Sequence, residues 1–210
     1  LIFLGDYIDK HVHTQAIITL LYQLDAHHNC IFIKGNHDYV WERYLNYREL
    51  SRHDFLINFG GIAALSQLCK NPAELLRHNR IGQIKSLLKS YLKLIPRLVD
   101  YVIIDEFIGL HAGITANQLM QKPLKFTESN YFLRPWQMNL TKKYLNKYRL
   151  VAGHTCLDTK PSIKPGYINL DLGAGYQGFL GALCIEDQQV IRSDGTKYNL
   201  VSKRSSAASK

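Results

Sequence analysis

Side chains that can bind metal ions or transfer protons occur at four places in this sequence, each directly after a short apolar run. They are Gly5-Asp6 with Asp9, Gly35-Asn36-His37-Asp38, His111-Ala112-Gly113, and Gly153-His154-Thr155. Carboxylate, amide oxygen and neutral imidazole together suit Mn, Fe or Zn better than Ca or Mg. The residue types therefore predict a site for divalent metal ions.

Each of these segments is weak evidence when taken alone. A lone histidine is more often a structural residue, and an aspartate at the end of a strand usually caps a turn. Four such segments in one chain, each ending an apolar run, are hard to obtain by chance. The combination therefore indicates a functional site.

The first two of these segments follow the two strands of a predicted βαβ unit. Residues 1–4 and 30–33 are short apolar runs typical of buried strands, and residues 15–24 show helical spacing of apolar side chains. This order implies parallel strands joined by a right-handed crossover. In α/β sheets, sites form beyond the carboxyl ends of the strands, and glycine beside a ligand lets the backbone turn sharply.

The rest of the chain adds a helical segment and further strands. We expect a helix over 39–50 and a helical cap or lid insert over about 62–95. Asn71-Pro72 has the pattern of a helix start, and this helix could run to about Leu94. The further strands are expected at 98–104, 107–110, 150–152, 167–172 and 179–185, the first two as a hairpin. We predict one α/β domain over residues 1–202 and a disordered tail over 203–210.

Composition narrows the class of protein. The formal net charge is +9, but the basic residues are dispersed, so we expect no specific nucleic-acid binding. No apolar run approaches the roughly 20 residues that span a bilayer, and no stretch has the pattern of a signal peptide. We therefore expect no membrane contact and a cytoplasmic location, and leave the oligomeric state open.

Several motifs resemble those of a known family. The segments GDYIDK, KGNHD, GLHAGI and VAGHT resemble the ordered motifs of the calcineurin-like metallophosphoesterases. They are most similar to the phosphoprotein (Ser/Thr) phosphatase branch and its bacterial relatives, including symmetrical diadenosine tetraphosphatases. The resemblance spans about Leu1 to Glu186. It implies a β-sandwich flanked by helices, in an α-β-β-α arrangement with a helical cap.

The resemblance also implies a dinuclear metal site. Asp6 would bridge two divalent metal ions, Mn, Fe or Zn, while Asn36, His111 and His154 would complete the ligands of the second. A hydroxide bridging the two metals would attack phosphorus. His37 would protonate the leaving alkoxide, and Asp9 would hold its orientation.

Two basic residues are candidates for binding phosphate. Lys10 stands where the family usually has an arginine, and an ammonium group offers no bidentate fork. Arg134 is a candidate for the family's second phosphate-binding arginine. The alternative for Arg134 is an ordinary loop arginine that stacks on Trp136.

The family's D-x-H motif, which supplies an aspartate and a histidine to the first metal, is expected ahead of Leu1. Asp25-Ala26-His27 falls at the end of the first predicted helix, which is the wrong position. We therefore expect an N-terminally truncated chain that lacks the first strand and helix. Such a chain would keep most of the second metal's ligands and have weak hydrolytic activity or none.

The sequence leaves three functions open. The first is a protein serine/threonine phosphatase acting on phosphorylated protein. The second is a diadenosine tetraphosphatase or another nucleotide hydrolase, with the helical insert over a nucleotide. The third is a non-catalytic scaffold of the same fold, which the substitutions at Lys10 and His11 favour and the retained ligands oppose.

Overall fold

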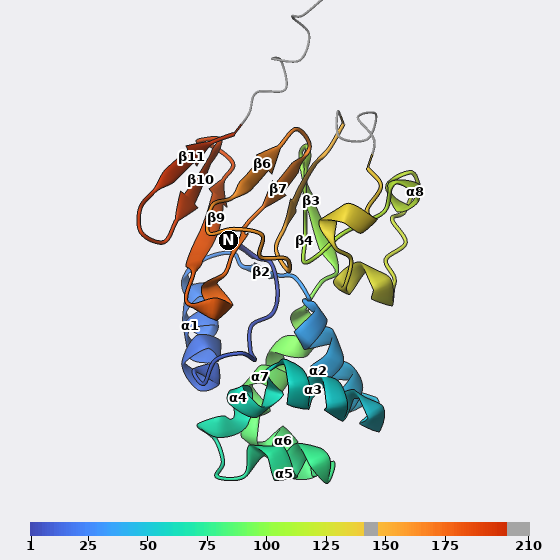
Figure 1. The fold of residues 1–210 in the computed structure, drawn as a ribbon, viewed down its shortest axis with the longest axis vertical. Helices are drawn as coiled ribbons and strands as arrows, with labels where there is room; N and C mark the ends of the chain where they lie inside the picture. Colours follow the sequence, from blue (N-terminus) through green and yellow to red (C-terminus); the bar gives the residue numbers. More distant parts are fainter. Residues whose placement is uncertain (141–146, 201–210) are drawn as a thin grey trace, which may run out of the picture. The chain divides into compact units, whose positions relative to one another are not determined.

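The computed structural model describes residues 1–140 and 147–200, and it divides into two compact units. The first unit is Leu1–Val99 and the second is Asp100–Lys210. Figure 1 shows that helices dominate the first unit and strands the second. A single domain over 1–202 stays a prediction, and the tail predicted at 203–210 lies outside the described residues.

The first unit begins with the predicted βαβ arrangement. Strand β1 (Ile2–Phe3), helix α1 (Thr14–His27) and strand β2 (Ile31–Phe32) follow one another, and the two strands pair in parallel. The helix buries Ile18 and Leu21, which lie three residues apart on one face. The prediction of a parallel βαβ unit is confirmed, so both strands end at the same edge.

Short helices make up the rest of the first unit. They are α2 (Asn36–Asn46), η1 (Leu50–Arg52), α3 (His53–Phe59), α4 (Gly61–Ser66), α5 (Pro72–Arg77), α6 (Ile81–Leu87), α7 (Lys89–Leu94) and η2 (Ile95–Arg97). The predicted start at Pro72 is confirmed, but one continuous helix to Leu94 is wrong. Asn79 has φ 49°, a left-handed conformation that ends the first of the three helices. Helix α2 begins at Asn36, earlier than the predicted Tyr39.

The described part of the second unit contains two sheets. Its strands are β3 (Tyr101–Ile104), β4 (Phe107–Leu110), β5 (Arg149–Ala152), β6 (Ser162–Lys164), β7 (Tyr167–Asn169), β8 (Asp171–Leu172), β9 (Phe179–Cys184), β10 (Gln189–Arg192) and β11 (Lys197–Asn199). The five-stranded sheet has the order β3-β4-β5-β7-β6, and the four-stranded sheet has the order β11-β10-β9-β8. The predicted hairpin β3-β4 is confirmed, with Asp105 left-handed at its turn.

Two features of the second unit position its histidines. Strands β4 and β5 run parallel, so residues that follow them come to the same edge of the sheet. A core of apolar residues holds this part of the sheet: Ile108, Leu110, Ile114, Met138, Leu150, Ala152 and Tyr167. Three short helical segments follow β4: α8 (Ala116–Leu119), η3 (Glu128–Tyr131) and η4 (Pro135–Gln137). A fourth, η5 (Ala174–Tyr176), follows β8.

The single strand predicted at 167–172 is wrong, because the chain there passes from one sheet to the other. Strand β7 pairs with β5, whereas β8 pairs with β9. The buried side chain of Asn169 marks the change: its Oδ1 accepts the backbone N–H of Asp171 at 3.0 Å. An apolar run is therefore shared between two sheets.

Within residues 1–140 and 147–200, no helix is long and apolar enough to cross a membrane.

Candidate metal centre

Asp6 lies in a strained turn directly after β1. Its φ is 59°, and that of the preceding Gly5 is 98°. Left-handed backbone is uncommon for residues other than glycine, although aspartate tolerates it better than most. The turn is held by Asp38, whose Oδ2 accepts the backbone N–H of Asp6 at 2.7 Å. The hydrogen bond to Asp38 therefore fixes the backbone of this candidate ligand.

The start of helix α2 approaches the carboxylate of Asp6 closely. The backbone N–H of His37 donates to Asp6 Oδ1 at 3.0 Å. A Cβ atom on Gly35 would lie 2.1 Å from the same oxygen, so only glycine permits this approach. Asn36, the first residue of the helix, is buried beside this turn. The two candidate ligands of the first unit thus come from neighbouring turns.

His37 and Asp9 form a buried pair. The Nδ1 atom of His37 lies 2.6 Å from Asp9 Oδ2, and Trp41 Nε1 donates to Asp9 Oδ1 at 2.9 Å. Burial lowers the pKa of His37, but the hydrogen bond that His37 donates to Asp9, together with the charges of Asp6 and Asp9, outweighs burial, so the pKa of His37 is raised. The predicted acid and its orienting carboxylate are therefore in contact, and Nδ1 carries the proton in that contact.

Lys10 lies next to this pair in an exposed left-handed turn. Its φ is 60° and that of Asp9 is 81°. A Cβ atom on Gly60 would lie 2.4 Å from the backbone nitrogen of Lys10, so the glycine before α4 allows the turn to pack there. The charge of Lys10 opposes part of the rise in the pKa of His37, so it acts at the position of the candidate acid.

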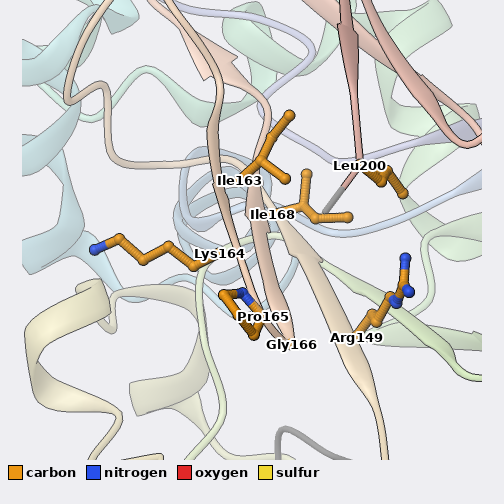
Figure 2. Close-up of a pocket in the computed structure, with 7 residues that line it drawn as sticks. All are labelled: Arg149, Ile163, Lys164, Pro165, Gly166, Ile168 and Leu200. Atoms are coloured by element: carbon orange, nitrogen blue, oxygen red, sulfur yellow. The ribbon is translucent and has the colours of Figure 1, made fainter. Parts of the chain in front are cut away.

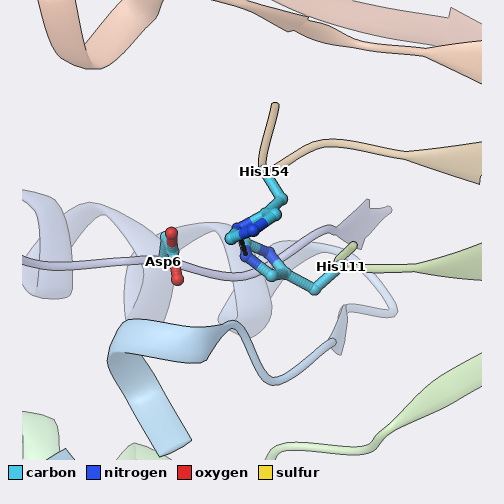
Figure 3. Close-up of side chains that lie close together, drawn as sticks. All are labelled: Asp6, His111 and His154. Atoms are coloured by element: carbon cyan, nitrogen blue, oxygen red, sulfur yellow. Dashed lines mark hydrogen bonds between the residues drawn. The ribbon is translucent and has the colours of Figure 1, made fainter. Parts of the chain in front are cut away.

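In the second unit, His111 and His154 come together at the ends of β4 and β5. Figure 3 shows their rings turned toward one another, with His111 Nε2 3.2 Å from His154 Nδ1. The backbone N–H of Gly153 donates to the carbonyl of His111 at 2.8 Å and ties the two segments together. We expected the neighbouring glycine to make the turn, but His154 itself is left-handed, with φ 65°.

The separation of these two nitrogens fits a shared ion. Ligand nitrogens at roughly 2.0–2.1 Å from one tetrahedral ion lie about 3 Å apart. The observed 3.2 Å matches this spacing, and His111 is buried while His154 is half-buried. The second unit therefore presents two nitrogen donors in an arrangement that a divalent metal ion fits.

Arg134 and Asn169 support the segment that carries His154. The Nη1 atom of Arg134 donates to the carbonyl of His154 at 3.2 Å and to Thr155 Oγ1 at 3.1 Å. The side chain of Asn169 donates to the carbonyl of Thr155 at 2.7 Å. Arg134 thus lies beside a candidate metal ligand, whereas Trp136 is 68% exposed.

Sequence reasoning missed four residues that hold the site. Asp38, Trp41 and Asn169 bind the backbone or side chains of candidate site residues, and Tyr91 donates to Asp38 Oδ1 at 2.6 Å. A signal existed only for Asp38, which follows His37 directly in the sequence. The other three act over distances that no local pattern encodes.

One small pocket of the second unit carries no candidate site residue (Figure 2). Its volume is about 10 Å³, which is room for roughly one water molecule. Arg149, which lines it, begins β5, whereas His154 follows the other end of that strand. The pocket is therefore too small for a substrate, and it lies at the opposite end of β5 from His154.

Comparisons with known proteins identify the fold. A family model described as calcineurin-like phosphoesterase matches residues 1–158, which include every predicted site residue. A solved structure described as a "putative diadenosine tetraphosphatase" is similar over 94% of this chain and 78% of its own, with 17% sequence identity and a TM-score of 0.54. No curated protein matches the chain significantly. The predicted α/β metallophosphoesterase fold is confirmed, and the chain belongs to the calcineurin-like phosphoesterase family.

Proposed function

We propose that this protein hydrolyses phosphoric esters with divalent metal ions held by Asp6, Asn36, His111 and His154. Family membership supports phosphoester chemistry and implies divalent metals. The observation that carries the proposal is the buried contact of 2.6 Å between His37 and Asp9, beside the turn that carries Asp6. A buried histidine bonded to a carboxylate is suited to proton transfer.

The chain's own residues supply the proton and its direction. Asp9 accepts from His37 Nδ1, so the ring presents Nε2 as the atom that donates to a leaving oxygen. Trp41 holds the second oxygen of Asp9 and keeps the pair in one orientation. Bound divalent ions would polarise the phosphoryl group and lower the pKa of a bound water molecule.

Two basic side chains are proposed to bind the phosphate oxygens. Lys10 supplies a point charge next to His37. Arg134 already donates to the turn at His154, which places its guanidinium group beside a candidate metal ligand. Its planar group can bind phosphate in a bidentate manner, which the ammonium group of Lys10 cannot do.

The proposed substrate class is phosphorylated serine or threonine in protein, because the GDYID and GNHD segments are most similar to the phosphoprotein phosphatase branch. Manganese is the proposed metal and the cytoplasm the proposed location.

A dinucleoside polyphosphate is the second candidate substrate. The description of the similar solved structure favours it. The first unit also has an open pocket of about 440 Å³ lined by Arg48, Leu50, Asn79, Arg80, Ile81, Gly82 and Gln83. The two arginines give this pocket the charge that additional phosphates need.

The test combines Mn²⁺ titration calorimetry with hydrolysis of a chromogenic phosphate monoester, a phosphopeptide and diadenosine tetraphosphate. The wild type, Asp6→Asn and a control, Asp54→Asn, are compared; the Asp54 side chain is 77% exposed. We expect Mn²⁺ binding and slow metal-dependent hydrolysis, in line with the weak activity expected from the sequence; Asp6→Asn should remove both and Asp54→Asn should keep both. Metal binding without hydrolysis of any of the three would favour the scaffold, and the ratio of the last two rates decides the substrate class.

A further inference from the structure

Tyr91 connects the last helix of the helical segment to the turn that carries Asp6. It lies on α7, is 1% exposed, and donates from its hydroxyl to Asp38 Oδ1 at 2.6 Å. The other oxygen, Asp38 Oδ2, accepts the backbone N–H groups of Asp6 at 2.7 Å and Gly35 at 2.8 Å. One carboxylate therefore joins the turn after β1, the turn after β2 and helix α7.

The position of Asp38 makes the hydroxyl of Tyr91 important. Asp38 is fully buried, and an ionised carboxylate has only acceptors. A buried charge is costly unless its oxygens receive hydrogen bonds. Burial and the neighbouring charge of Asp38 raise the pKa of Tyr91 well above its usual value, so the phenol keeps its proton and remains a donor at neutral pH.

Helix α7 is itself bound to helix α1 near both of its ends. Tyr22 on α1 donates to the carbonyl of Ser90 at 3.1 Å, and Arg97, just beyond α7, pairs with Asp25 at 2.8 Å. The hydroxyl of Tyr91 is therefore presented by a helix that is anchored to α1. Such a helix can hold Asp38 in one position, because its own backbone is held.

We propose that Tyr91 is a positioning residue for the metal centre: it holds Asp38, and Asp38 fixes the backbone of Asp6 and Gly35. This inference rests on the proposed function, because Asp6 is its metal ligand. The helical segment, expected as a cap or lid, then has a second role as a support of the metal-binding turn. Tyr91 touches no substrate in this account and acts only through Asp38.

The test compares Tyr91→Phe with Tyr44→Phe. Each change removes one oxygen atom from a buried phenol of the first unit, and the hydroxyl of Tyr44 has no hydrogen-bond partner among the described residues. We expect Tyr91→Phe to weaken Mn²⁺ binding by about 10- to 100-fold, the range typical of residues that support metal ligands. Its kcat should recover at saturating Mn²⁺ with an unchanged KM for the phosphate monoester, and Tyr44→Phe should match the wild type throughout.

Amide hydrogen exchange gives a readout that does not depend on metal or activity. In Tyr91→Phe, the amides of Asp6 and Gly35 should exchange faster, while those of helix α1 stay protected. General loss of protection across the first unit would mean a merely structural role and would overturn the proposal. So would equal Mn²⁺ affinity in Tyr91→Phe and Tyr44→Phe, and in that case a metal-dependent wild type leaves the proposed function standing. A wild type that binds no Mn²⁺ would overturn both.

Discussion

The two units hold their candidate site residues by different means. In the first unit, each oxygen of two buried carboxylates receives its own hydrogen bond: Asp9 from His37 and Trp41, and Asp38 from Tyr91 and two backbone N–H groups. In the second unit, the two candidate ligands are imidazoles on turns held mainly through backbone carbonyls.

The difference follows from charge. A buried carboxylate must be surrounded by donors, because leaving one charged oxygen without a partner is costly. A neutral imidazole has no such requirement, so parallel strands and a few bonds to carbonyls are enough to place it. We therefore expect that removing a hydrogen-bond donor from a buried carboxylate lowers the free energy of unfolding more than removing one from the turns that carry the histidines.

The largest effect is expected for the candidate acid. His37→Asn should lower kcat for the phosphate monoester by about 10²- to 10⁴-fold, because proton transfer to the leaving group is lost. Mn²⁺ affinity should largely remain, since His37 donates its hydrogen bond to Asp6 from the backbone, and its ring Nε2 lies as far as 4.0 Å from Asp6 Oδ2.

The matched control is His53→Asn in the same unit, whose ring bonds to the carbonyl of Leu50 and to Asp54. It should keep the wild-type rate. Equal kcat values for the two variants would contradict the role of His37 in proton transfer.

The next largest effect is expected on stability, and it compares the hydrogen bonds that hold the candidate site residues in the two units. Trp41→Phe leaves a buried carboxylate oxygen of Asp9 without its donor and should lower the free energy of unfolding by about 1–3 kcal/mol. Asn169→Ala removes a donor from the carbonyl of Thr155 and an acceptor from the backbone N–H of Asp171; because both partners are neutral, it should lower the free energy of unfolding less. Urea denaturation of both variants measures the difference, and a larger cost for Asn169→Ala would contradict the role given to charge.

The smallest effect is expected away from the site, where the two units should behave alike. Burial raises the pKa of Tyr44 to about 12, and burial followed by the charge of Asp171 raises that of Tyr167 to about 12, from an ordinary value of 10.0. A raised pKa contributes stability below pH 10.0 that is lost as the pH rises to about 12.

Denaturation between these pH values should therefore show a shallower loss of stability in Tyr44→Phe and in Tyr167→Phe than in the wild type. An unchanged slope in both variants would mean that these phenols titrate as in the unfolded chain.

Local patterns in the sequence predict much of this architecture. The parallel β1-α1-β2 unit and the β3-β4 hairpin follow from apolar periodicity and turn residues, and candidate ligands at strand ends follow from them. The pair formed by His37 and Asp9, which the resemblance implied, is present in the structure. These features depend on residues close in sequence or on motifs of ordered spacing.

The remainder depends on contacts between distant residues. Tyr91 lies 53 residues from Asp38, and an apolar helix pattern does not distinguish a tyrosine that packs from one that donates. The helix predicted over 71–94 is interrupted at Asn79, and the strand predicted over 167–172 divides between two sheets at Asn169. In each case tertiary hydrogen bonding or backbone conformation overrides the local periodicity.

The most direct test of the central claim is a double-mutant cycle on Mn²⁺ affinity with Asp6→Asn and His111→Asn. Asp6 and His111 are both proposed as metal ligands. We predict that each single change lowers the affinity strongly and that the double variant is little worse than either, because residues that share a site are not additive. Additive losses, or an unchanged affinity in one of the single variants, would contradict the proposal that Asp6 and His111 bind metal together.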